Sequence, residues 1–235
     1  MILILSDGCY LKDRCWKYNN ISMDCQKISE YCPKLFKIDY LYNEALLSPK
    51  QRKHTPLRID EDGTDRDQFS RLKHIEDDIE NFVSDGCNLY LHSQGCGNGK
   101  TEWSFRLLQS YVGRIWHKSD LTCKVLFVHV PRYLTELKNS FTEKSEYVDH
   151  IKSCILKADL VVFDEIATKA GTQFELEILL SLINTRIDMG KSNIYTSNVS
   201  GQDLKDKIGD RLYSRIVNMS TDIELFGKDK RCLSV

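Results

Sequence analysis

The pattern of apolar and polar residues changes near residue 67, and beyond it segments with helical and strand-like spacing alternate. Residues 69–83 place apolar side chains at helical intervals, and the short apolar run CNLYLH follows at 87–92. The same pattern predicts further helices over 102–116, 132–141, 147–157, 174–189, 204–208 and 210–218, and further strands over 124–130, 159–165, 192–198 and 221–227.

Two of the predicted strands contain the wholly apolar runs VLFV (125–128) and LVVF (160–163). Such runs are typical of strands that are buried on both faces of a sheet. Strands that alternate with helices favour a parallel sheet covered by helices on both sides. The sequence therefore predicts the α/β fold class for residues 67–235.

The chain before residue 67 has a different character. Residues 1–40 are rich in Cys and aromatic residues and only weakly periodic, and we expect a small module there. Residues 41–66 contain Pro49, Pro56 and a mixed run of charges, and they predict the end of a short helix followed by a linker. The predicted α/β domain then occupies residues 67–235.

Composition narrows the classes of protein further. Of the 235 residues, 41% are hydrophobic, which is enough for a sizeable core. The 33 basic residues balance 34 acidic ones, which excludes binding to nucleic acid through overall charge alone. No apolar run reaches ~18 residues. The start MILILSDGCY lacks the basic residues of a signal peptide, so we expect a cytoplasmic protein with no membrane partner.

The strongest chemical signal is a glycine-rich loop between a predicted strand and a predicted helix. In phosphate loops, glycines let backbone N–H groups turn toward phosphate oxygens, a lysine reaches the β- and γ-phosphates, and a hydroxyl holds Mg²⁺. Gln94 stands where the motif has its first glycine, so a chance glycine-rich turn is the alternative. We expect an ATP and Mg²⁺ site formed by Gly95, Cys96, Gly97, Asn98, Gly99, Lys100 and Thr101.

Two acids, Asp164 and Glu165, end the apolar strand at 159–165. The carboxyl end of a central parallel strand borders the crevice where ligands bind in such folds. We expect Asp164 to hold Mg²⁺ through water and Glu165 to polarise the attacking water. The alternative is a strand that is simply capped by solvated acids.

Polar residues further along the chain could complete the site. Asn198 ends the strand SNIYTSN and could orient the attacking water, although Asn also favours turns. Arg211 and Arg215 are spaced i, i+4 on one helix face, from which they could reach a neighbouring subunit's nucleotide. A solvated, salt-bridged helix explains them equally well. For Arg231 a charged tail is the simpler explanation.

Four of the nine cysteines fall within the first 32 residues. Four thiolates are enough for a tetrahedral zinc ion, and a module this small needs added stability to fold. Their spacing lacks tight C-x₂-C pairs, so free buried cysteines in a helical hairpin remain the alternative. We expect a structural zinc site formed by Cys9, Cys15, Cys25 and Cys32.

From about residue 67 to 231 the chain resembles the AAA+ ATPases of the DnaC/DnaI type, the loaders of replicative helicases. The resemblance is carried by GCGNGKT, LVVFDEI, IYTSN, GDRLYSRI and IELFGKDKR, in that order. It implies an AAA+ domain without a helical lid domain. The Cys-rich start followed by a Pro-containing linker is similar to phage-type loaders, in which a small zinc-bearing domain grips the helicase.

The resemblance also implies roles for single residues. Lys100 and Thr101 would be phosphate-loop residues, and Asp164 and Glu165 would be the Mg²⁺-binding and water-activating acids. In addition, Asn198 matches the first sensor, Arg215 the arginine finger with Arg211 beside it, and Arg231, more loosely, the second sensor.

The implied function is ATP-dependent loading of a hexameric helicase onto single-stranded DNA during replication initiation. ATP binding would drive self-association, and slow hydrolysis would reset the assembly. DNA contacts would come from local loops, around Lys169–Thr172 and Arg132–Ser140. The alternatives are a transposition ATPase of the IstB type, a small-molecule phosphotransferase and an adaptor with an inactive nucleotide site. The intact acids and the near-neutral residues 1–62 favour the loader.

Overall fold

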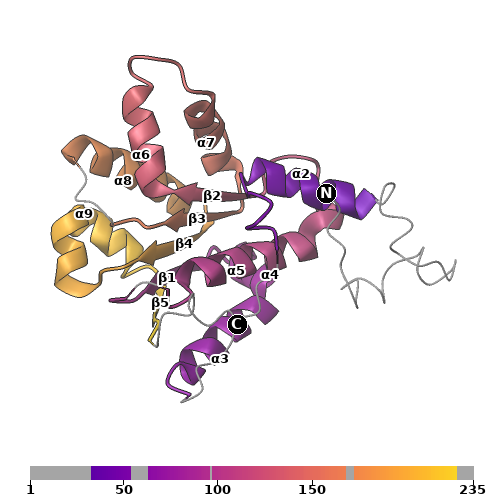
Figure 1. The fold of residues 1–235 in the computed structure, drawn as a ribbon, viewed down its shortest axis with the longest axis horizontal. Helices are drawn as coiled ribbons and strands as arrows, with labels where there is room; N and C mark the ends of the chain where they lie inside the picture. Colours follow the sequence, from indigo (N-terminus) through magenta and orange to yellow (C-terminus); the bar gives the residue numbers. More distant parts are fainter. Residues whose placement is uncertain (1–32, 54–62, 96, 168–171, 227–235) are drawn as a thin grey trace, which may run out of the picture.

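The computed structural model describes residues 33–53, 63–95, 97–167 and 172–226 (Figure 1). Within these residues a five-stranded sheet has the order β2-β3-β4-β1-β5, and every neighbouring pair is parallel. The parallel α/β sheet expected from the sequence is therefore confirmed. The strands are β1 (Asn88–His92), β2 (Val125–His129), β3 (Leu160–Asp164), β4 (Ser192–Ser197) and β5 (Thr221–Glu224).

Helices cover both faces of this sheet (Figure 1). One face carries α2 (Pro33–Glu44), α3 (Arg66–Asp77), α4 (Ile79–Ser84) and α5 (Lys100–Ile115), which the short 3₁₀ helix η4 (Trp116–Lys118) extends. The other face carries α6 (Val130–Asn139), α7 (Glu146–Lys157), α8 (Gln173–Asp188) and α9 (Gly201–Ile216). In the described residues no helix is both long and apolar enough to span a lipid bilayer.

Two helix boundaries differ from the sequence prediction. The single helix expected over 69–83 is divided at Asp78 into α3 and α4. The two short helices expected over 204–208 and 210–218 form one element, α9, which is bent at Gly209. Gly209 has φ 78°, a conformation that is open to glycine and costly for other residues.

The strands separate two hydrophobic cores because successive side chains point to opposite faces of the sheet. On β3, Leu160 and Val162 enter the core shared with α2 to α5, whereas Val161 and Phe163 enter the core shared with α6 to α9. All five side chains of β3 are buried. This two-sided burial explains why the sequence of the strand is an uninterrupted apolar run.

Residues 41–53, which the sequence assigns to a linker, pack against the sheet. Leu41, Tyr42, Ala45 and Leu47 are buried in the first core. The carbonyl oxygen of Ala45 accepts a hydrogen bond of 3.2 Å from the backbone N–H of Phe127, on the edge strand β2. The apolar residues of this segment have helical spacing. The free energy gained by burying them outweighs the preference of the neighbouring charged residues for water. Residues 54–62 of the expected linker lie outside the described residues.

A buried carboxylate holds α3 against α5, the helix that follows the glycine-rich loop. The Glu76 carboxylate accepts hydrogen bonds from Arg106 Nε (2.9 Å), Lys73 Nζ (3.0 Å) and Ser110 Oγ (3.0 Å). Burial alone would raise the pKa of Glu76, but these hydrogen bonds outweigh it and the pKa lies below its usual value. The carboxylate therefore stays charged and paired near neutral pH.

A buried arginine connects four segments at the opposite side of the sheet. Arg186 of α8 is 0% exposed, and its Nε donates to Asn193 Oδ1 at 2.6 Å. Its Nη1 donates to the carbonyl oxygens of Ile155 and Ala158, and its Nη2 donates to that of Ser192 at 2.6 Å. Burial lowers the pKa of Arg186 to about 10, so the guanidinium remains charged at neutral pH.

We expect the substitution Arg186→Met to lower the free energy of unfolding by about 3 kcal/mol or more, because it leaves several buried carbonyl oxygens without a donor. Chemical denaturation followed by circular dichroism measures this loss. The matched control is Arg66→Met at the exposed start of α3, where a change within about 0.5 kcal/mol is expected. Equal stability of the two variants would contradict the role of Arg186.

Candidate nucleotide-binding site

The glycine-rich loop joins β1 to α5 at the carboxyl edge of the sheet. Gly97 and Gly99 both have positive φ, of 80° and 93°. Gly99 immediately precedes α5, so the loop turns sharply into the helix and leaves the first N–H groups of α5 pointing at the loop. Such a helix start attracts anions. Cys96 lies outside the described residues.

Lys100, the first residue of α5, turns its side chain back into the loop. It is only 7% exposed, and its Nζ donates to the carbonyl oxygen of Gly95 (2.9 Å) and to Ser93 Oγ. Ser93 in turn donates to the same carbonyl oxygen at 2.7 Å. The loop therefore holds a positive charge at its centre, which is the arrangement that binds phosphate groups.

Asp164 lies beside this loop at the end of β3 and is 4% exposed. Its Oδ1 accepts hydrogen bonds from Thr101 Oγ1 (3.1 Å) and Thr196 Oγ1 (2.7 Å). Burial raises the pKa of Asp164, and the two hydroxyl hydrogen bonds oppose that rise. The Thr101 hydroxyl and the Asp164 carboxylate thus lie side by side, as hard oxygen ligands suited to Mg²⁺.

Glu165 follows directly and is held in an unusual conformation. Its φ is 58°, in the left-handed region that is costly for a residue other than glycine. Its backbone N–H donates to Thr196 Oγ1 at 2.9 Å, and its Oε2 lies 3.4 Å from His129 Nε2. Thr196 therefore supports both acids, with one hydrogen bond to each.

His129 ends β2 next to Asp164, its partner in the sheet register. Its Nδ1 accepts a hydrogen bond of 3.3 Å from the backbone N–H of Arg132 at the start of α6. An accepting Nδ1 leaves the proton of the neutral ring on Nε2, which faces the Glu165 carboxylate. One ligand atom from each of His129, Asp164 and Glu165 lies within 4.8 Å of the others, close enough to surround a cation.

Sequence reasoning missed His129, Thr196 and Ser93. It singled out no histidine and chose Asn198 as the polar residue of its strand. The structure shows Thr196, two residues earlier, as the β4 residue that bonds to Asp164. The signal that could have found His129 and Thr196 is their place at the carboxyl ends of strands that neighbour β3.

The remaining predicted residues are distributed as follows. Asn198 comes directly after β4 and is partly exposed, while Arg211 and Arg215 lie on the second half of α9. Arg211 is exposed, and Arg215 Nη1 contacts Met219 Sδ at 3.3 Å. Their helix buries Leu212 and Ile216 instead, so both arginines are left at the surface. Arg231 lies outside the described residues.

Comparison with known proteins identifies the fold. The family model of the bacterial DnaA ATPase domain matches residues 74–221. A crystal structure of the DnaC helicase loader has a TM-score of 0.56 and 17% identity over 79% of this chain and 98% of that one. No curated protein matches by sequence.

Two further structures share the fold. A crystal structure of DnaI has a TM-score of 0.59 and 22% identity over 81% of this chain and 100% of that one. The initiator DnaA bound to AMPPCP and single-stranded DNA has a TM-score of 0.55 and 18% identity over 77% of this chain, and the match spans 51% of DnaA. The AAA+ fold expected from the sequence is thereby confirmed.

The raised pKa of Asp164 predicts how stability depends on pH. Below the usual aspartate pKa of 3.8 the carboxyl group is protonated in the folded and unfolded states alike. As pH rises through the window between 3.8 and the higher folded pKa, the folded protein loses stability, because a buried charge is worse than a solvated one. Without nucleotide, Asp164→Asn should therefore be more stable than the parent protein at neutral pH.

Thermal unfolding of both proteins between pH 4 and pH 8 measures this difference, which should widen as pH rises. Asp188→Asn is the control, because this exposed aspartate ends α8, close to the start of β4 and far from its carboxyl end. A gap between parent and Asp164→Asn that stays constant with pH would contradict the burial effect.

Proposed function

The chain belongs to the family of bacterial DnaA ATPase domains, and from this membership we propose that it is an Mg²⁺-dependent ATPase that loads a hexameric replicative helicase onto single-stranded DNA. The observation that carries the ATPase part is the convergence of Lys100, Thr101, Asp164 and Glu165 at one edge of the sheet. The match along nearly the whole of the DnaC and DnaI structures, against half of DnaA, supports the loader part.

Each residue of the site has a distinct role in this proposal. Lys100 binds the β- and γ-phosphates of ATP, in exchange for its contacts with Ser93 and Gly95. Thr101 and Asp164 hold Mg²⁺, which supplies positive charge opposite the phosphates as the bond breaks. Glu165 polarises the attacking water, and Asn198 orients it.

His129 positions the Glu165 carboxylate through its Nε2. In the neutral ring Nε2 carries the proton and lies 3.4 Å from Glu165 Oε2, which keeps that carboxylate turned toward β2. Loss of this contact frees Glu165 to accept a proton from water. Hydrolysis is slow as long as the His129 contact holds, which suits a protein that must stay assembled while it loads a helicase.

The arginines at the surface of α9 act between subunits. Among the described residues Arg215 contacts Met219 Sδ and makes no ion pair, so its guanidinium can reach a nucleotide bound by the next subunit. ATP binding then favours self-association, because each bound nucleotide supplies negative charge to the neighbour's arginine. Arg211, one turn earlier on α9, lies next to Arg215 and assists it.

The helicase and single-stranded DNA bind to different parts of the chain, the N-terminal segment and the ATPase domain. The first 32 residues, with their zinc-binding cysteines, hold the helicase. Single-stranded DNA contacts the assembled ATPase domains. Of the two contact regions predicted from the sequence, the one over residues 132–140 lies mainly in α6, which the structure describes. Arg132 lies 4.4 Å from the ring of Tyr147 there, a pairing of cation and aromatic side chain that suits nucleic acid bases and phosphates.

Affinity capture of the replicative helicase tests the proposal. The full chain with ATP and Mg²⁺ should retain the helicase from an extract of the source cell, identified by mass spectrometry. Deletion of residues 1–32 should abolish capture, whereas a deletion into residues 33–53 would also damage the core. Lys100→Ala should lose ATP binding, with exposed Lys118→Ala as its control. Recovery of a transposase in place of the helicase would refute the loader assignment.

Arg215→Ala tests the action between subunits. ATP binding by the monomer should be unchanged, and hydrolysis by the assembled protein should fall by about 10³-fold. Lys205→Ala, on the same helix and paired only with Asp210, is the control and should hydrolyse ATP at the parent rate. An Arg215→Ala protein with unaltered hydrolysis would rule out this role.

A further inference from the structure

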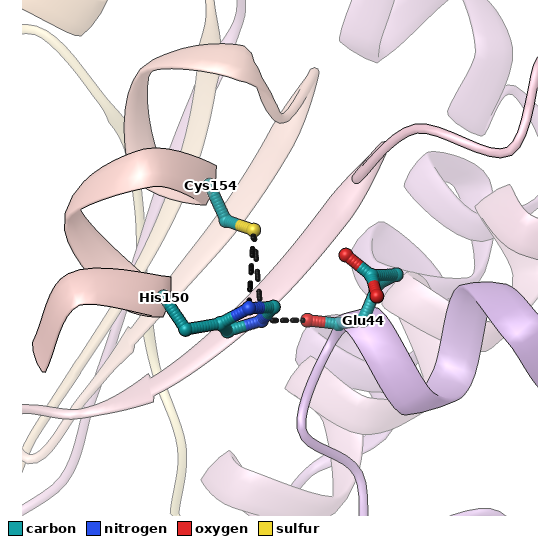
Figure 2. Close-up of side chains that lie close together, drawn as sticks. All are labelled: Glu44, His150 and Cys154. Carbon is teal, nitrogen blue, oxygen red and sulfur yellow. Dashed lines mark hydrogen bonds between the residues drawn. The ribbon is translucent and has the colours of Figure 1, made fainter. Parts of the chain in front are cut away.

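A second cluster of metal-binding side chains lies away from the nucleotide site, where α2 ends beside α7 (Figure 2). Glu44 is the last residue of α2, and His150 and Cys154 are one turn apart on α7. One ligand atom from each of the three lies within 4.8 Å of the others. Cys123, the buried thiol just before β2, donates its own hydrogen bond to the carbonyl oxygen of Val125 at 3.4 Å and lies outside this group of three.

The spacing of these atoms lies close to that of a tetrahedral zinc site. Zinc bonds of about 2.3 Å to sulfur and 2.0 Å to nitrogen, at a tetrahedral angle, place the two ligand atoms about 3.5 Å apart. Cys154 Sγ lies 4.0 Å from His150 Nδ1 and 3.5 Å from Nε2. For Nδ1 and Sγ to bind one zinc ion, their separation would shorten by about 0.5 Å.

The hydrogen bonding of His150 selects which nitrogen is available. Its Nε2 lies 2.9 Å from the backbone oxygen of Glu44, and a carbonyl oxygen can only accept. Nε2 therefore carries the proton, and Nδ1 keeps its lone pair on the side of the cluster. Zinc-binding histidines commonly have this arrangement, in which the second nitrogen donates to a carbonyl or carboxylate oxygen.

The burial of the cluster suits a bound cation, because part of the cluster is buried and part is accessible to solvent. Cys154 is 4% exposed, whereas Glu44 and His150 are partly exposed. Burial raises the pKa of the Cys154 thiol. Without a cation this thiol stays neutral, and a divalent cation is the group that would convert it to a thiolate.

We propose that Glu44, His150 and Cys154 form a zinc site that fastens α2 to α7, with water as the fourth ligand. The sulfur and nitrogen ligands favour zinc over Mg²⁺, which prefers oxygen ligands only. The site crosses the β2 edge of the sheet, because α2 belongs to one core and α7 to the other. It fixes the start of the ATPase domain, and with it the point from which the first 32 residues extend. It depends on neither ATP hydrolysis nor helicase loading.

Metal binding by the full chain tests the site. Cys9, Cys15, Cys25 and Cys32 are replaced by Ser, so that the cysteines of the N-terminal module cannot contribute. This protein, purified without added zinc, should contain one zinc ion per chain. After removal of zinc, titration with Co²⁺ should give thiolate-to-cobalt charge-transfer absorption together with intense tetrahedral d–d bands.

Single substitutions on that background assign the ligands. Cys154→Ser should remove the charge-transfer absorption, and Glu44→Gln, which leaves the core intact, should weaken Co²⁺ affinity at least about tenfold. Cys87→Ser is the matched control, because Cys87 is an exposed thiol outside the cluster. It should bind Co²⁺ as the background protein does.

Three results would overturn the proposal. They are a background protein that is folded but contains no zinc and binds no Co²⁺, a metal content that Cys154→Ser leaves unchanged, and a thiol titration that finds Cys123 and Cys154 joined as a disulfide. If the four Ser substitutions prevent folding, the comparison is made in the parent sequence. There Cys154→Ser should lower the zinc content by one ion per chain, and an unchanged content would refute the site.

Discussion

The buried guanidinium of Arg186 joins the starts of β3 and β4, and the geometry of the candidate nucleotide site depends on this connection. Its acceptors include the carbonyl oxygens of Ala158, just before β3, and Ser192, the first residue of β4. The two strands are short and fully buried, so the register that is fixed at their starts is kept to their carboxyl ends. Asp164 and Thr196 meet at the carboxyl ends of β3 and β4 because Arg186 holds the register at the starts of these strands.

The carboxyl ends of the strands carry interactions that cost folding energy. Asp164 is a buried acid whose pKa is raised, and Glu165 has a backbone conformation that is unfavourable for its side chain. The surrounding sheet is rigid enough to tolerate both. An acid held in place before ligand arrives loses little further freedom on binding, which is the advantage of a preorganised site. Thr196 supports both residues, because its hydroxyl donates to Asp164 Oδ1 and accepts from the backbone N–H of Glu165.

The chemistry of the chain is divided in space. The phosphate loop and the acids occupy the carboxyl edge of the sheet, the arginines of α9 lie on the outer surface, and the Glu44 cluster lies where α2 crosses the β2 edge. The separation allows each of the three regions to be altered by substitution independently of the others. Ala45, bonded to Phe127 of β2, is the point at which the N-terminal segment joins the sheet.

The sequence by itself determined the α/β class and the phosphate loop with its two acids, because apolar strand periodicity and a glycine-lysine-threonine turn are local patterns. It also placed the arginines of α9, although their action between subunits stays a prediction. Only the tertiary structure decided that residues 41–53 belong to the core, that Thr196 and His129 serve the acids, and that Glu44 meets His150 and Cys154. These relations join residues that are distant in the chain, and they follow from strand order and helix packing, which no local pattern encodes.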